Sequence, residues 1–122
     1  MANDWDITAR NVAADAVAAL CTRLALHTSD PGGANSATAE VTGGSPAYAR
    51  KAVTWNAASA GAATQNGDVV LDVPACTVAW VSGWNTAGTV RYFKKDVTDE
   101  VFGAQGTYTV KGTTSSLDFN DP

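Results

Sequence analysis

The chain has 122 residues, which is the usual length of one domain with a single core. Its net charge of −4 argues against nucleic acid as a partner, because binding phosphates requires a concentrated basic face and the eight Lys and Arg residues are scattered. No run of about eighteen apolar residues is present, so we expect no membrane insertion. The N-terminus lacks the pattern of a secretory signal, and we expect synthesis in a cytoplasm.

The first predicted element is a helix over about residues 7–21. Apolar residues recur at Ala13, Val17 and Leu20, with a second row at Val12, Ala16 and Ala19, and this spacing fits a period of about 3.6 residues. One apolar stripe indicates a helix that lies on a sheet. An oxygen-bearing side chain is expected to cap its N-terminus, and the candidates are Asp4, Asp6 and Thr8.

Residues from about 24 to 120 are predicted to form a β domain, so that residues 1–122 make one structural domain. Alternating apolar residues between Gly-rich turns indicate strands at 24–27, 48–55, 68–73, 77–81, 89–93, 107–110 and 116–119. Within 48–55, the face that carries Val53 and Trp55 is expected to point inward. The fold class is therefore mainly β, an antiparallel β-sandwich or barrel with one N-terminal amphipathic helix packed on it.

Charged residues gather in one segment, where Lys94, Lys95 and Asp96 are followed by Asp99 and Glu100. We predict a solvated edge strand or loop, because charges of this kind protect a sheet edge against unwanted pairing.

No catalytic, cofactor-binding or metal-binding set is recognisable, so an enzyme is not predicted. The single histidine, His27, has no Ser, Cys or Asp constellation beside it, and we expect a structural role for it. Cys21 and Cys76 lie among apolar residues and are expected to be small buried side chains. A disulfide between them stays open, because spacing alone cannot decide it.

Two blocks carry a resemblance to a known family. The first is L-x-L-H-T-x-D-P-G at residues 24–32, and the second is T-G-G-S-x-x-Y-A-R-K-A-V-T-W at residues 42–55. Together they resemble small virion proteins of tailed bacteriophages, described as tail-fibre-like or minor tail proteins. The likeness continues in residues 80–89 and, more weakly, in 106–109 and 117–119. The resemblance implies a homo-oligomer, commonly a trimer, located in the virion.

The leading hypothesis is a minor tail, tail-tip or tail-fibre-associated protein that assembles with other virion proteins through the loops 28–46 and 83–88. One alternative is a capsid decoration protein on the head lattice. Another is a module that binds a host-surface carbohydrate or receptor, with Trp84 and Asn85, or Tyr92 near Asp96, as the stacking site. A hydrolase that acts on the cell wall ranks last.

Aromatic residues give a large contact area together with one polar group, so they are the expected interface anchors. Trp55 and Trp80 are expected in the core, whereas Trp84, beside a polar turn, is expected at an interface. The predicted interface residues are Tyr48, Arg50, Trp84, Asn85 and Tyr92.

Overall fold

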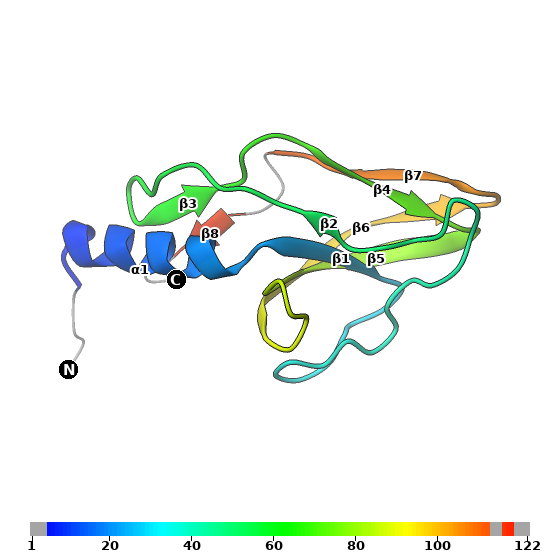
Figure 1. The fold of residues 1–122 in the computed structure, drawn as a ribbon, viewed down its shortest axis with the longest axis horizontal. Coiled ribbons are helices and arrows are strands. Elements are labelled where there is room, and N and C mark those ends of the chain that lie inside the picture. Colours follow the sequence, from blue (N-terminus) through cyan, green and yellow to red (C-terminus); the bar gives the residue numbers. More distant parts are fainter. Residues whose placement is uncertain (1–4, 113–115, 119–122) are drawn as a thin grey trace.

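The computed structural model describes residues 5–112 and 116–118 (Figure 1). One helix, α1 (Ile7–Leu20), precedes the strands. The strands are β1 (Arg23–His27), β2 (Lys51–Ala52), β3 (Ala62–Thr64), β4 (Val69–Val73), β5 (Cys76–Trp84), β6 (Arg91–Phe102), β7 (Gly106–Val110) and β8 (Ser116–Asp118). They form a four-stranded sheet in the order β2-β1-β5-β6 and two pairs, β4-β7 and β3-β8. All pairings are antiparallel, and the described strands do not close into a barrel, which confirms the mainly β class.

The main core lies between the four-stranded sheet and the β4-β7 pair. In β4 the burial alternates, with Val69, Leu71 and Val73 inward and Val70 exposed, as the period of two predicts. These residues meet Leu24 and Leu26 of β1, among others. The two layers therefore make an open sandwich, and Figure 1 shows β4 and β7 on one side of β1, β5 and β6.

A second, smaller core joins α1 to the β3-β8 pair. Ala14, Cys21, Ala63 and Leu117 are buried there, and Val17 packs against them. Two side chains of the helix fasten it to the segment before β3: Asn11 Oδ1 accepts the Gly61 N–H at 2.8 Å, and Asp15 Oδ1 accepts the Ala58 N–H at 2.8 Å. The helix thus packs on a sheet as predicted, at the end of the molecule away from β4 and β7 (Figure 1).

Among the described residues, nothing covers the opposite face of α1. Val12 is 63% exposed, and Ala16 and Ala19 are exposed as well, so the second predicted apolar row does not reach the core. Leu20, from the first row, is also exposed, at 55%. Asp6 occupies the N-cap position, but its side chain makes no capping hydrogen bond; Asp4 lies outside the described residues. No helix among the described residues is long and apolar enough to cross a membrane.

Four strand predictions need correction. The strand predicted at 48–55 is only Lys51–Ala52, and just before it the Tyr48 and Arg50 side chains bind Glu40 of the preceding loop. β3 was not predicted, since its Ala-rich sequence gives no alternation. The strand predicted at 89–93 is instead one long edge strand, β6 (Arg91–Phe102), and it includes the charged segment, for which the edge alternative is confirmed. Phe119, at the end of the last predicted strand, lies outside the described residues.

The fourth correction concerns Gly83, which was expected to open a turn. The strand β5 continues through Gly83 to Trp84. A Cβ atom at this position would lie 2.6 Å from Cys21 Sγ and closer still to the Phe93 ring. The glycine is therefore required by side-chain packing across the sheet and not by turn geometry.

Candidate functional site

The loop of residues 28–46 covers the face of the four-stranded sheet that points away from the main core; we call it the latched loop. On this face His27 lies opposite Trp80, and Trp84 lies further along β5. The loop is held at its two ends by backbone bonds, from the Thr28 N–H to the Ala39 carbonyl at 2.9 Å and from the Val41 N–H to the Leu26 carbonyl at 3.0 Å. Figure 1 shows it projecting below β1 and β5.

Glu40, at the end of this loop, is the centre of the first polar cluster. Its carboxylate accepts hydrogen bonds from Arg50 Nε at 2.9 Å, from Arg50 Nη2 at 2.8 Å and from the Tyr48 hydroxyl at 2.8 Å. The Tyr48 oxygen in turn accepts the Leu26 N–H at 3.0 Å. Burial alone would raise the pKa of Glu40, but these donors outweigh it and hold the pKa below its ordinary value.

The Arg50 guanidinium also lies over the Trp84 ring, with 4.1 Å between its central carbon and the ring centroid. This cation–π contact joins the Glu40 cluster to the sheet face. The bidentate pairing with Glu40 raises the pKa of Arg50. The Arg50 side chain is 22% exposed.

A second chain of hydrogen bonds runs beneath the loop. Trp84 Nε1 donates to Ser82 Oγ at 2.7 Å, Ser82 Oγ lies 2.6 Å from His27 Nε2, and His27 Nδ1 lies 3.1 Å from the Thr38 carbonyl. The carbonyl can only accept, so His27 carries its proton on Nδ1 and Ser82 donates to Nε2. Burial lowers the pKa of His27 and so keeps the ring neutral. His27 is therefore a buried, hydrogen-bonded structural residue, as predicted.

Two basic residues of β6 hold the tip of the latched loop. Arg91 Nη2 donates to the Gly32 and Gly33 carbonyls at 2.8 Å each. Lys94 Nζ donates to Asp30 Oδ1 at 2.7 Å, and this bond lowers the pKa of Asp30. The D-P-G block that carried the sequence resemblance is thus fixed by residues more than fifty positions later in the chain.

The turn after β5 lies beside this tip. Asn85 Oδ1 accepts the Thr89 and Val90 N–H groups at 2.9 and 3.1 Å, so Asn85 holds the turn closed. The Arg91 N–H donates to Asn35 Oδ1 of the latched loop at 2.9 Å, which joins the two segments. The tip of the loop and the turn therefore form one surface on the same side of the sheet (Figure 1).

The five predicted interface residues differ in how far they are buried. Trp84 is only 1% exposed, whereas Trp80, expected in the core, is half-buried, so the predicted ranking of these two tryptophans is reversed. A buried Trp84 ring cannot stack on a sugar in this chain. Tyr48, Arg50, Asn85 and Tyr92 keep part of their surface exposed, and the first three hold the loop and the turn in place.

Both cysteines are free thiols. Cys21 is buried as predicted, and this burial raises its pKa to about 12, so the thiol stays protonated at neutral pH. Cys76 is only half-buried. Across residues 5–112 and 116–118, no three His, Cys, Asp or Glu side chains gather into a group that could hold a metal ion.

Sequence reasoning missed the residues that organise this site: Glu40, Ser82, Arg91 and Lys94. Glu40 belongs to a segment read only as loop, and Arg91 to a short strand. No sequence motif marks these residues, because the residues that they contact lie far away in the sequence and only the fold brings the partners together.

A family model described as Podophage GP4 fiber I protein gp80 matches residues 3–95. The matched part includes α1, the latched loop, the turn after β5 and the basic residues Arg91 and Lys94 that hold the loop. A search of curated proteins found no match, and a search of solved structures found none either.

Proposed function

We infer the function of this chain from its family: the chain belongs to the Podophage GP4 fiber I protein gp80 family. Membership supports a structural role associated with the tail fibre of a phage particle, in contact with other virion proteins. We propose, within this role, a small minor tail or tail-tip protein that works by protein–protein assembly and not by catalysis.

The observation that carries this proposal is the rigid presentation of the latched loop. A loop this long, without helix or strand of its own, is usually either functional or disordered. Here it is fixed by Glu40 and Arg50 at its base and by Arg91 and Lys94 at its tip. Rigid loops lose little entropy on binding, so the arrangement suits a surface that docks on a neighbouring subunit.

The proposed contact surface consists of the exposed loop tip at residues 33–35 and the exposed turn at residues 86–89. Asn35 joins the two through the Arg91 N–H. Behind the exposed residues, Asn85 accepts the Thr89 N–H and Arg50 packs on the buried Trp84 ring. Tyr48 binds Glu40 at the base of the loop.

Immunogold electron microscopy of intact phage particles, with antibody raised against this protein, tests the proposed location. We expect gold at the tail fibres or the tail tip. Gold spread over the head would replace the tail assignment with capsid decoration, and no label on intact or disrupted particles would contradict a virion role.

A matched pair of substitutions tests the surface. Ala34→Arg places a large charged side chain on the exposed loop tip and is expected to reduce incorporation into particles at least tenfold, since one misplaced charge at a docked surface costs several kcal/mol. Ala57→Arg makes the same change on an exposed segment near α1 and is expected to incorporate normally. Equal incorporation of the two variants would place the contact elsewhere.

A further inference from the structure

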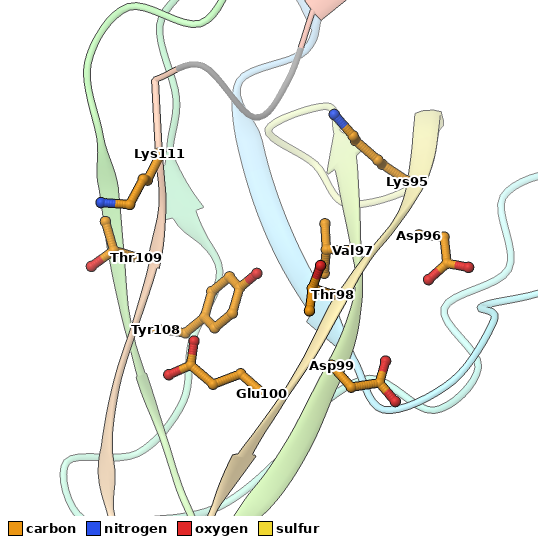
Figure 2. A pocket seen from close by; sticks show the side chains of 9 residues that line it. All are labelled: Lys95, Asp96, Val97, Thr98, Asp99, Glu100, Tyr108, Thr109 and Lys111. Atoms are coloured by element: carbon orange, nitrogen blue, oxygen red, sulfur yellow. The ribbon is translucent and has the colours of Figure 1, made fainter.

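The outer edge of β6 has no partner strand among the described residues. β6 is the last strand of the four-stranded sheet, and its neighbour in that sheet is β5. A hollow of about 570 Å³ lies along this edge, lined by residues 95–100 and by Tyr108, Thr109 and Lys111 of the facing segment (Figure 2). Consecutive strand residues point to opposite faces, so a hollow that is lined by six in a row follows the strand edge and not one face.

An edge strand presents a row of backbone N–H and C=O groups, to which an extended segment of another chain can bond. The length of the edge decides how many such bonds can form. β6 has twelve residues, whereas β2, at the other edge of this sheet, has two. The side chains of residues 98–101 are all exposed, and Val101 is 75% exposed although it is apolar. β6 is therefore the edge of this sheet that is suited to receive an added strand.

Three acidic side chains lie along β6 and are not neutralised within the described part of the chain. Asp96, Asp99 and Glu100 make no ion pair and no side-chain hydrogen bond with any described residue. In contrast, the two acidic side chains of the latched loop are each bonded to a basic side chain. Figure 2 shows Glu100 directed toward Tyr108, whereas Asp96 and Asp99 point to the other side of the strand.

The basic side chains of the same strand do not neutralise Asp96 and Asp99. Lys94 is already bonded to an acidic residue of the latched loop. Lys95 lies opposite Val81, whose side chain is in the main core, so Lys95 points to the core-facing side of the sheet. A strand that adds to β6 therefore meets two carboxylates on its other side, and basic side chains are what would offset them there.

We propose that the β6 edge receives an extended segment of another virion protein, which adds as a strand and places basic side chains beside Asp96 and Asp99. Opposite charges on neighbouring strands favour pairing and like charges oppose it, so this edge selects a basic strand and rejects an acidic one. On the core-facing side the segment needs apolar side chains, because Val97 and Tyr108 border the hollow there. The occupant is thus a segment in which basic and apolar residues alternate.

The inference deepens the proposed assembly role and rests on it, because it gives the chemistry of one partner. Its first test needs only the purified full-length chain and synthetic peptides. Failure of this test is therefore distinguishable from failure of the virion location, which immunogold labelling measures.

A synthetic peptide of about seven residues, with Lys and Val in alternation, is the probe of this edge. The control peptide carries Glu in place of each Lys, and backbone amide NMR spectra of the full-length chain follow both titrations. We expect the basic peptide to bind at least about tenfold more tightly and to shift and protect the β6 amides that point away from β5. Equal binding of the two peptides, or shifts confined to another surface, would overturn the proposal.

A third peptide separates strand pairing from general attraction between charges. It keeps the Lys and Val side chains but carries a methyl group on each backbone nitrogen, so that it cannot donate to the carbonyl groups of β6. We expect this peptide to bind at least about tenfold more weakly than the unmethylated one. Equal binding of the methylated peptide would mean that charge alone attracts it, and strand addition would be refuted.

Charge reversal on the protein gives the complementary test. Asp99→Lys is expected to weaken binding of the basic peptide about tenfold, and Asp96→Lys combined with Asp99→Lys is expected to make the acidic peptide the tighter one. Asp72→Lys makes the same change on the outer face of β4 and is expected to keep the wild-type preference. Circular dichroism checks the fold of each variant. A folded double variant that still prefers the basic peptide would contradict the proposal.

Incorporation into phage particles tests whether a virion protein supplies the segment. The double variant is expected to be incorporated at least about tenfold less than the wild-type chain, because its reversed charges repel a basic strand. Asp72→Lys is expected to be incorporated normally. Normal incorporation of the double variant would show that no virion protein occupies the β6 edge.

Discussion

On the latched face of the four-stranded sheet, the polar side chains of His27, Ser82 and Trp84 all find partners within the chain, and loop 28–46 covers them. Along the β6 edge of the same sheet, the outward backbone groups face an open hollow. Buried polar groups without partners are costly, so a closed network indicates a surface that is complete in the single chain. An open edge indicates a surface that another chain can complete. Substitutions on the latched face and on β6 are expected to have different effects.

Truncation of Trp84 is expected to have the largest effect. Trp84→Ala removes a ring that is 1% exposed, its contact with Arg50 and its bond to Ser82, and should lower the free energy of unfolding by about 3–5 kcal/mol. Urea denaturation of the purified protein measures it. Trp80→Ala, on the same strand but half-buried, is expected to cost less. A larger loss for Trp80→Ala would contradict the burial ranking.

Neutralising Glu40 is expected to have the next largest effect. Glu40→Gln keeps the shape but leaves Arg50 without its carboxylate, which should cost about 1–3 kcal/mol. The latched loop should also become sensitive to limited proteolysis. Glu100→Gln, the same change on the β6 edge, should alter the stability of the monomer by less than about 0.5 kcal/mol. If both variants lose stability equally, Glu40 does not hold the loop.

A pH series tests His27, with a smaller effect. Burial lowers its pKa below the ordinary value of 6.5, so the unfolded chain binds a proton more readily than the folded one. The stability due to His27 is complete above about pH 6.5 and is lost as the pH falls through the lowered pKa. Urea midpoints between pH 8 and 5 should therefore decline, and His27→Gln should flatten this decline. An unchanged slope would show that another group titrates in this window. The pKa of Glu40 is also lowered, and its contribution is lost at more acidic pH, below its ordinary value of 4.5.

The smallest effect is expected at Val101. Val101→Thr changes a side chain that is 75% exposed in the single chain and keeps its β-branched shape, so the stability of the monomer should change by less than about 0.5 kcal/mol. The measurement is a urea titration of the purified protein. A loss above 1 kcal/mol would show that the β6 edge is covered within the chain.

Strong local patterns allowed much of the fold to be predicted from the sequence. The helix, predicted over about residues 7–21 and observed at Ile7–Leu20, and the alternation of Val69, Leu71 and Val73 were predicted because periodicity is a local property. β3 carries only Ala, Ala and Thr, and it became a strand because β8 pairs with it. Gly83 was misread for the same reason, since the need for a glycine comes from Phe93 and Cys21 across the sheet.

The candidate site was less predictable than the fold. Tyr48 and Arg50 were predicted as interface residues, and the structure shows both bonded to Glu40, which the sequence analysis did not single out. The burial of Trp84 depends on a loop that the sequence describes only as polar. The charges of β6 were visible in the sequence as a run. Which of them share a face became apparent only in the structure. Side-chain direction along an irregular strand is set by the register with β5, which the sequence does not reveal.

Hydrogen–deuterium exchange of the purified chain tests the difference between the latched face and the β6 edge. We expect slow exchange at Thr28 and Val41 of the latched loop, because their N–H groups are bonded within the chain. We expect quick exchange at the β6 amides that point away from β5, because the outer edge of β6 has no partner strand among the described residues. Rapid exchange at Thr28 and Val41, or slow exchange at these β6 amides, would contradict the difference.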